Sequence, residues 1–590
     1  MKIKLLFIVV YILNTLLLNA QAPNWAWEKN KGSNQGFPVT TAYNNETYGN
    51  GIITDSNGNV YTVGAFQSYT LAVGNYTLTN TSNTGTVTNV FIAKYDATGN
   101  VLWAKSVAGT SGGTYVEYEN ISIDASGNIY ITGGFSSQTI SFDAITLTKT
   151  TNQGAEDIFI AKYTSSGSVA WAKNFGGSKD DYGNAIAVDA LNNIYMSANF
   201  SSDSITIGSY TLRNDNGSEP NGFNMCIAKL DANGNIVFAK RVGLNCTINT
   251  CGNNMITDAN NNLYVTGMFT NCLTIIGNDT SHCSSNSGSY FLVKYDASGN
   301  PLWARYGVGC SQTSEANDIT LDAYGSVYIA GNFKGTCFVI ASDTLSHSAI
   351  DNSGFLAKYS SSGTALWAKN MNTATGTNAL DASLNHLATD AYGNIYVAGG
   401  FANGYNGSTY PVFGSDTLKN NVGGQAAIYV AKYDTAGNSI WGQTAQSNAW
   451  SEIGQVTTDK YGNIFVTGLY SCKDFIFNNT DTLYNANEAT TSNPAPDYFI
   501  AKIGTVGVGI KKYNSIDNVI VYPNPSNGGI NIANTNNIDE IKVTDMLGQI
   551  VYEAKPNTEN TILKIDNSGI YFITITSGTV TSTKKVIIDK

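Results

Sequence analysis

The chain has 590 residues, of which 13% are charged, and its formal net charge is −11. That length exceeds one ordinary hydrophobic core, so several domains or one large repeat array is expected. The 32 Lys and Arg residues are outnumbered by 43 Asp and Glu and form no basic run. This balance argues against nucleic acid and anionic membrane surfaces as partners.

Residues 1–22 are typical of a secretory signal peptide. A short basic start precedes an apolar stretch at residues 5–18, and Ala20-Gln21-Ala22 provides a small-residue cleavage site. A membrane anchor is the alternative. However, Asn14 interrupts the apolar stretch, which is shorter than the roughly 20 residues of a spanning helix. We therefore expect an exported mature chain without a transmembrane segment.

One pattern, Asp-x-x-Gly-Asn-x-Tyr, recurs with variation along most of the chain. Its seven copies occupy residues 55–61, 124–130, 189–195, 258–264, 322–328, 390–396 and 459–465. Such regular spacing indicates one structural unit that is repeated around an axis or along a line.

Each repeat contains two predicted β-hairpins, and therefore four strands. The pattern itself, flanked by alternating apolar residues, forms the first hairpin, and residues 91–105 illustrate the second. Trp103 in that second hairpin has equivalents in most other repeats, and Phe238 replaces it once.

The two ends of the array complement each other. Residues 499–503 supply the first strand of a second hairpin without its partner, and residues 26–30 supply the partner strand without a first strand. A propeller pairs such strands to remove an exposed sheet edge. We therefore predict an all-β, seven-bladed β-propeller over residues 23–503, closed by pairing of N- and C-terminal strands.

The repeats are longer than the roughly 40 to 50 residues of well-known propeller blades. Most of the excess lies between the two hairpins, as in residues 205–212 and 412–418, and predicts a short extra hairpin. Variable insertions on a rigid scaffold often bind ligands, so these segments are the predicted ligand surface.

The repeats resemble the bacterial β-propeller repeats known by their Asp-x-x-Gly-Asn-x-Tyr-x-x-Gly core, over about residues 25–503. This resemblance implies a fold and leaves the activity open.

After residue 503 the repeat ends. Residues 504–517 are a predicted linker, and residues 518–590 carry short alternating strands of a separate small β domain. Several ordered motifs of this segment closely resemble the type A sorting domain of type IX secretion. The matching residues are Pro523, Asn524, Pro525, Asp545, Gly548, Gly569, Tyr571, Lys584 and Lys585.

The resemblance implies a small immunoglobulin-like β-sandwich, a Bacteroidetes-type source and export by the type IX secretion machinery. The protein would then be extracellular or on the outer cell surface, usually after removal of the sorting domain. An immunoglobulin-like accessory domain without a sorting role is the alternative.

Eight cysteines in an exported chain permit disulfides. Hairpin pairing favours a bridge between Cys310 and Cys337. By the same logic Cys246 or Cys251 could meet Cys272, with Cys283 nearby for the remaining partner. Cys226 occupies a position otherwise held by Phe or Tyr and is predicted to be a buried free thiol. The sequence contains no Cys-x-x-Cys pair, so it does not indicate a metal site formed by cysteines.

The Asp-rich turns, such as residues 55–59, superficially resemble calcium loops, but the twelfth-position Glu of such loops is absent. Hairpin turns explain the same residues without metal. No cofactor is therefore predicted, and calcium binding stays an alternative.

No catalytic motif is evident. His282, His347 and His386 fall in segments that read as variable, and each is expected at the surface. The favoured hypothesis is a non-enzymatic binding or adhesion scaffold for glycan or protein. The alternative is a polysaccharide-active enzyme with carboxylates in the insertions. Candidate acids are Asp180, Asp181, Asp215 and Glu219.

Overall fold

The repeated Asp turn shapes each hairpin in the computed structural model. In the first repeat, Asp55 accepts hydrogen bonds at Oδ1 from the backbone N–H groups of Asn57 and Asn59, both at 2.9 Å. Gly58 has a φ of 83°, in the left-handed region that glycine tolerates. The turn interpretation of these Asp residues is therefore confirmed.

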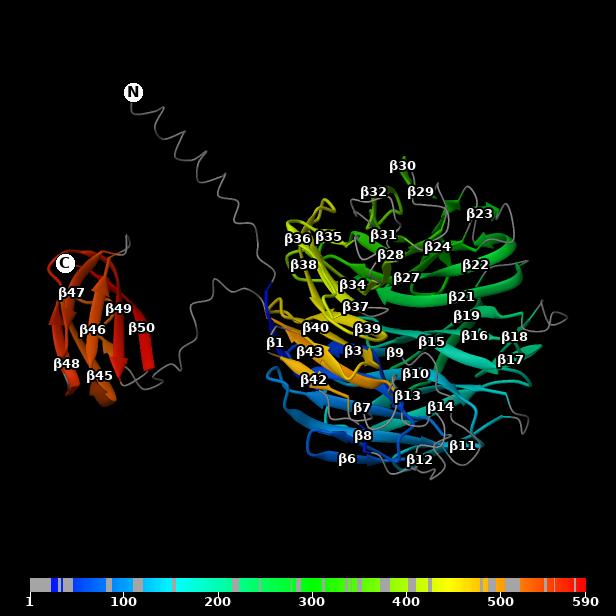
Figure 1. Ribbon diagram of the computed structural model, residues 1–590, viewed down its shortest axis with the longest axis horizontal. Helices are drawn as coiled ribbons and strands as arrows, with labels where there is room; N and C mark the ends of the chain where they lie inside the picture. Colours follow the sequence, from blue (N-terminus) through cyan, green and yellow to red (C-terminus); the bar gives the residue numbers. More distant parts are fainter. Residues whose placement is uncertain are drawn as a thin grey trace. The chain divides into compact units, whose positions relative to one another are not determined.

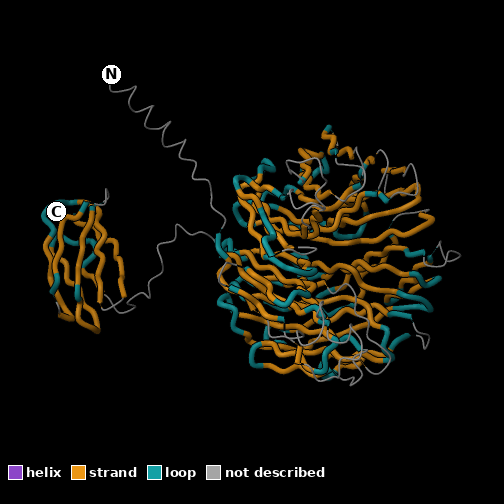
Figure 2. The backbone as a smooth tube through the Cα atoms, in the orientation of Figure 1, coloured by secondary structure: helices purple, strands orange, loops and turns teal. Residues whose placement is uncertain are grey.

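The structure describes residues 23–29, 33–34, 46–80, 87–109, 120–150, 155–214, 222–242, 246–276, 279–282, 288–309, 313–334, 338–340, 342–346, 353–371, 382–401, 410–422, 427–477, 481–485, 495–504, 520–545, 549–556, 558–577 and 580–589. Within these ranges the protein is all-β, with antiparallel sheets and no helix (Figure 2). The predicted signal peptide lies outside the described residues. In the part of the chain that is described, we find no helix with the length and apolar character needed to cross a bilayer.

Each copy of the pattern belongs to four strands that pair in antiparallel order. In chain order these groups of four are β3 (Thr47–Thr54), β4 (Val60–Phe66), β7 (Asn89–Tyr95) and β8 (Val101–Gly109); β9 (Asn120–Ile123), β10 (Ile129–Phe135), β13 (Asp157–Tyr163) and β14 (Val169–Phe175); β15 (Asp181–Val188), β16 (Ile194–Phe200), β19 (Asn224–Leu230) and β20 (Ile236–Arg241); β21 (Cys246–Thr257), β22 (Leu263–Ile276), β24 (Ser289–Tyr295) and β25 (Pro301–Tyr306); β27 (Ser314–Leu321), β28 (Val327–Phe333), β31 (Ser353–Tyr359) and β32 (Ala365–Asn370); β33 (Ala382–Thr389), β34 (Ile395–Phe401), β37 (Ala427–Tyr433) and β38 (Ser439–Ala445); and β39 (Ser451–Thr458), β40 (Ile464–Tyr470), β43 (Asp497–Ile503) and β1 (Trp25–Lys29).

The last group joins the two ends of the array. Strand β1 pairs antiparallel with β43, and Trp27 lies opposite Lys502 in their register. Figure 1 shows β1 beside β43, although their residues are far apart in the sequence.

The first strands of neighbouring repeats lie side by side, with equivalent residues in contact. Thr458 donates from Oγ1 to the carbonyl of Thr389 (2.8 Å), and Thr54 donates to the carbonyl of Thr458 (2.9 Å). The second of these bonds links the last repeat to the first one. The seventh and first repeats therefore make the same threonine contact as the sixth and seventh repeats.

Short hairpins lie between the two main hairpins of the repeats, as predicted. They are formed by β5 (Thr70–Val73) and β6 (Tyr76–Thr79); β11 (Thr139–Phe142) and β12 (Ile145–Thr148); β17 (Ser204–Ile207) and β18 (Tyr210–Arg213); the end of β22 and β23 (Asp279–His282); β29 (Phe338–Ile340) and β30 (Asp343–Leu345); β35 (Val412–Phe413) and β36 (Asp416–Thr417); and β41 (Asp474–Ile476) and β42 (Thr482–Tyr484). Two short strands, β2 (Ser33–Asn34) and β26 (Val308–Gly309), pair with β5 and β29.

The described residues divide into two compact units, one within residues 1–505 and one within residues 506–590. In the second unit, one sheet has the order β44-β45-β48 and the other β47-β46-β49-β50. These sheets share one buried core, which includes Ile530, Ile541 and Ile573. The strands are β44 (Ile520–Tyr522), β45 (Gly529–Ile538), β46 (Glu540–Thr544), β47 (Ile550–Ala554), β48 (Thr558–Lys564), β49 (Gly569–Ser577) and β50 (Val580–Ile588).

Candidate functional site

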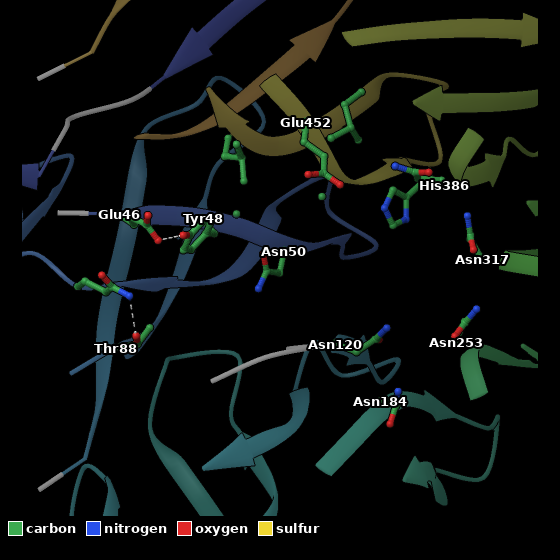
Figure 3. Close-up of a pocket in the computed structure, with 16 residues that line it drawn as sticks. Glu46, Tyr48, Asn50, Thr88, Asn120, Asn184, Asn253, Asn317, His386 and Glu452 are labelled. Atoms are coloured by element: carbon green, nitrogen blue, oxygen red, sulfur yellow. Dashed lines mark hydrogen bonds between the residues drawn. The ribbon is translucent and has the colours of Figure 1, made fainter. Parts of the chain in front are cut away.

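A pocket of about 670 Å³ lies among the first strands of the repeats. Asparagine side chains from six repeats line it (Figure 3). Five of them stand five positions before the Asp of the repeated pattern, and Asn120 stands one position later in the second repeat. These six residues, which we call the asparagine ring, are Asn50, Asn120, Asn184, Asn253, Asn317 and Asn385.

A bulge in the first strand positions these side chains. In β3 the register with β4 shifts between Gly49 and Gly51, which leaves Asn50 as the extra residue, and the same shift occurs at Asn184. A bulged residue is released from the ladder and re-aimed. Gly49 allows this geometry, because a Cβ at this position would lie 2.2 Å from Oγ1 of Thr467.

Part of the asparagine ring ties neighbouring repeats together. Asn253 donates from Nδ2 to the carbonyl of Ala316 (3.0 Å), and Asn317 donates to the carbonyl of Leu384 (3.2 Å). These acceptors stand at the same position of successive repeats, one residue before Asn317 and Asn385. Such bonds fix the orientation of two amides.

Other members of the asparagine ring have side-chain groups that could hydrogen-bond to a ligand. The side chains of Asn120 and Asn385 line the pocket, and neither makes a hydrogen bond to any described residue. The side-chain oxygen of Asn184 is buried without a partner among the described residues. A buried polar atom without a partner is costly, so a bound ligand or water would stabilise it.

Two carboxyl groups line the same pocket. Burial raises the pKa of Glu46, which accepts a hydrogen bond from the hydroxyl of Tyr48. Burial also raises the pKa of Glu452, although the charge of His386 partly offsets this effect. Both side chains are therefore closer to neutral than exposed glutamates at mildly acidic pH.

His386 corrects one expectation from the sequence. It lies on β33 at the pocket and is not an exposed residue of a variable segment. Its Nδ1 lies 3.6 Å from Oδ2 of Asp318, which also accepts the backbone N–H of Leu387 (2.8 Å). The other two histidines are His282, whose side chain lies outside the described residues, and His347, which lies outside them altogether.

The carboxylates of the Asp turns are occupied by protein donors. Oδ2 of Asp55 accepts from Nδ2 of Asn59 (2.7 Å) and from the hydroxyl of Tyr61 (3.2 Å), and Nζ of Lys94 lies 3.7 Å away. Burial opposes ionisation, but these donors hold the pKa of Asp55 below its usual value. No group of three His, Cys, Asp or Glu side chains among the described residues is arranged to hold a metal.

Of the predicted acids of the insertions, the two that the structure describes are bound by protein donors. Asp181 begins β15 and is fully buried, where it accepts hydrogen bonds from Ser202 Oγ (2.7 Å) and Gly177 N (2.8 Å). Asp180 accepts the backbone N–H of Glu156 (3.1 Å). Asp215 and Glu219 lie outside the described residues.

Cys226 is a buried free thiol, as predicted, and burial raises its pKa to about 12. Cys310 and Cys337 lie outside the described residues, as do the side chains of Cys251 and Cys272, so both disulfides stay predictions. The backbone register places Cys272 opposite Cys246, and Cys251 opposite Met268. This register favours Cys246 over Cys251 as the partner of Cys272.

In the C-terminal unit the sorting motif joins two distant segments. Asn524, between Pro523 and Pro525, donates to the carbonyl of Lys585 (2.8 Å) and accepts the N–H of Ile587 (2.9 Å). Asn524 therefore holds the end of β50, which carries Lys584 and Lys585.

The other motif residues stabilise turns or strand ends. Asp545 accepts the N–H of Gln549 at Oδ1 (2.9 Å), and Tyr571 donates to the carbonyl of Asn567 (3.1 Å). Gly569 begins β49 opposite Ile588. Gly548 lies outside the described residues.

Residues 520–589 match the family model described as "Secretion system C-terminal sorting domain". The chain carries a type IX secretion sorting domain. Such a domain directs export, so the protein is destined for the cell surface or the extracellular space.

Other comparisons concern the repeats. Over 541 residues the chain is 23% identical to the WD repeat-containing protein L264 of Acanthamoeba polyphaga mimivirus, a match that covers 77% of this chain and 36% of that protein. The match thus spans about a third of that relative's length.

The solved structures that resemble the chain have low sequence identity. A protein of unknown function from Dyadobacter fermentans is 10% identical (TM-score 0.36; 67% of this chain, 96% of the other). PorZ, a surface component of the type-IX secretion system of Porphyromonas gingivalis, is 11% identical (TM-score 0.18; 93% and 100%). YCF48 bound to D1 peptide is 8% identical (TM-score 0.30; 66% and 93%).

The asparagine ring was missed in the sequence, although a signal exists. Gly-Asn stands at the same distance before the Asp of the pattern at Gly49-Asn50, Gly183-Asn184 and Gly252-Asn253. An asparagine at a fixed repeat position, in a strand that is otherwise apolar, indicates a side chain that faces away from the hydrophobic core.

Proposed function

We propose that this protein is an exported, non-enzymatic binding protein whose pocket takes a neutral saccharide. The observation that carries the proposal is the asparagine ring, in which side-chain amides from six repeats converge on one pocket. An amide offers two donors and two acceptor sites, which suits the hydroxyl groups of a sugar.

The scaffold in this proposal is a seven-bladed propeller that is closed by β1. The bonds that link the seventh and first repeats support closure. Lys502 donates from Nζ to the carbonyl of Ala97 (3.3 Å), just as Lys94 donates to the carbonyl of Ser165 in the next repeat (3.2 Å). A closed ring would hold the asparagine ring rigidly.

The electrostatics of the pocket favour a ligand without charge. The asparagine ring is neutral, and Glu46 and Glu452 have raised pKa values. An anionic ligand would lie against carboxyl groups. Most polar side chains of the pocket are uncharged amides, which offer hydrogen bonds to hydroxyl groups without favouring a cation.

The remaining elements of the proposal concern export. Residues 1–22 act as the signal peptide, residues 504–517 link the propeller to the sorting domain, and the type IX machinery recognises residues 518–590. The free or surface-attached propeller would then bind its ligand outside the cell.

Calorimetric titration of the full chain with neutral oligosaccharides of glucose, xylose, mannose and galactose tests the binding site. The double variant N120A/N385A should lose at least tenfold in affinity without a change in melting temperature, because these amides hold no described residue in place. Asn233→Ala changes an exposed turn asparagine outside the pocket and is the matched control. Absence of binding, or equal affinity in the double variant, would overturn the proposal.

A polysaccharide-cleaving enzyme is the second candidate, because Glu46 and Glu452 line one pocket and both have raised pKa values. A glycosidase needs one carboxylic acid that is protonated and a second carboxylate. Incubation of the same oligosaccharides with the full chain distinguishes the candidates. Shorter products that disappear in Glu452→Gln would favour the enzyme, and unchanged oligosaccharides would favour binding.

A further inference from the structure

Three consecutive repeats present a tyrosine at the same place in the Asp turn. Tyr324, Tyr392 and Tyr461 each follow the turn Asp by two residues in the fifth, sixth and seventh repeats. Their exposed fractions are 81%, 78% and 62%, whereas most large aromatic side chains of the repeats are buried. Exposure of large aromatic rings at one repeated position is unusual for a soluble surface.

The backbone holds these three tyrosines in place. The N–H of Tyr324 donates to Oδ1 of Asp322, and the N–H groups of Tyr392 and Tyr461 make the same bond to their own turn Asp, each at 2.9 Å. A fixed turn displays a ring at low entropic cost, because only the two side-chain torsions remain free.

The rings extend from one turn toward the next. A Cβ at Gly393, in the sixth repeat, would lie 3.9 Å from the ring of Tyr324, and a Cβ at Gly58, in the first repeat, would lie 3.6 Å from the ring of Tyr461. The rings of Tyr324 and Tyr461 thus reach the turns of the sixth and first repeats. We call Tyr324, Tyr392 and Tyr461 the tyrosine track.

The tyrosine track lies away from the asparagine ring. The track follows the ends of the first strands, after Thr389 and Thr458, whereas the asparagine ring belongs to the earlier part of the same strands. None of the three tyrosines lines the pocket. A ligand of the track is therefore independent of the proposed pocket ligand.

We propose that the tyrosine track binds a neutral polysaccharide chain, with successive sugar rings packed on successive tyrosines. Three sites of one kind at the same position of successive repeats match a ligand that itself repeats, and three weak contacts along one chain add through effective concentration. The adjacent second-hairpin turns supply hydroxyl groups at Ser361, Ser362 and Thr435. The ammonium group of Lys460 lies 5.0 Å from the centroid of the Tyr461 ring, and Tyr461 is still 62% exposed. Exposed aromatic faces with hydroxyl-bearing neighbours suit the apolar faces and hydroxyl edges of pyranose rings.

Repeats outside the track have other residues at the equivalent position. Asn57 and Asn260 occupy it in the first and fourth repeats, which flank the track on either side, and both are exposed. Replacement of Asn57 by Tyr would lengthen the track by one ring beside Tyr461. This variant provides a gain-of-binding test that misfolding cannot imitate.

Affinity electrophoresis of the full chain in gels that contain dextran, mannan, xyloglucan or galactan tests the proposal. Retardation by at least one polysaccharide is expected. The triple variant Y324A/Y392A/Y461A should migrate as in an empty gel, a single variant should bind about three- to tenfold more weakly, and Asn57→Tyr should bind more tightly than the unchanged chain.

Tyr484→Ala is the matched control, because Tyr484 is 65% exposed on β42, outside the track. Retardation by none of the polysaccharides would overturn the proposal. So would retardation by gelatin alone, which would indicate a polypeptide ligand, or equal retardation of the triple variant. Loss of binding in N120A/N385A alone would assign the polysaccharide to the pocket instead.

Discussion

The indole N–H of Trp27 donates a hydrogen bond to the carbonyl of Ala97 (3.4 Å), 70 residues further along the chain. The same bond joins Trp103 to Ser165 (3.3 Å) between the first and second repeats. The ring of Trp27 also packs on Gly99, as the ring of Trp103 packs on Gly167. The N-terminal strand therefore contacts the first repeat as a regular member of the array.

Trp27→Ala should lower the free energy of unfolding by about 2 to 4 kcal/mol, because a half-buried aromatic ring and its hydrogen bond are lost at this junction. Trp27→Phe should lose less, since Phe238 packs on Gly299 in the corresponding place of the third repeat. Urea denaturation followed by tryptophan fluorescence provides the measurement. Trp450→Ala, at a 44% exposed tryptophan, is the control, and equal losses in Trp27→Ala and Trp450→Ala would contradict the junction role.

Much of the fold could be predicted from the sequence because the turn residues recur in every repeat. Asp, Gly and the following Asn or Ser fix a hairpin locally, so the positions of Asp55 and Asp322 in β-turns follow from short-range chemistry. The strand pairing of β1 with β43 was also accessible, because each segment lacked a partner within its own repeat.

The candidate site was harder to predict from the sequence than the fold. Asn50 and Asn385 stand in strands that pattern as core, and only the bulge turns them toward the pocket. His386 illustrates the same difficulty, because its relation to Asp318 depends on the contact between neighbouring repeats rather than on local sequence. Side-chain convergence across repeats is a long-range property that a single sequence does not display.

Asp258→Asn should reduce the loss of stability in acid. Burial opposes ionisation of Asp258, but hydrogen bonds from Asn262 and the charge of Lys294 hold its pKa below the usual value. A depressed pKa stabilises the folded state above pH 3.8, and this contribution disappears as the pH falls through the folded-state pKa. The unfolding free energy of the variant should therefore fall less between pH 5 and pH 3 than that of the unchanged chain.

Asp203→Asn is the control for this comparison, because Asp203 forms an exposed ion pair with Lys179 and such pairs contribute little. Equal pH dependence in Asp258→Asn and the unchanged chain would show that the turn carboxylates do not set acid stability.

Asp181 should have the opposite pH effect. Burial raises its pKa to about 7, although hydrogen bonds from Ser202 and Gly177 oppose the shift. The folded state then binds a proton that the unfolded state has released, so the unfolding free energy should fall as the pH rises from about 4 to 7, by at most about 1.4 kcal/mol per pH unit. Asp181→Asn should remove this slope, which urea denaturation at pH 5, 6 and 7 would reveal. A variant that keeps the slope would place its origin elsewhere.

Asn524→Ala should loosen the end of β50 and reduce export. Asn524 both donates to the carbonyl of Lys585 and accepts the N–H of Ile587, so the substitution leaves two backbone groups without their partner. Hydrogen exchange of the full chain should show faster exchange at the Ile587 amide, and the secreted fraction of the protein should fall. Asn560→Ala, at an exposed asparagine of β48, is the matched control. If the Ile587 amide exchanged at the same rate in both variants, Asn524 would not be the residue that holds β50, and any loss of export would have to come from direct contact of its side chain with the secretion machinery.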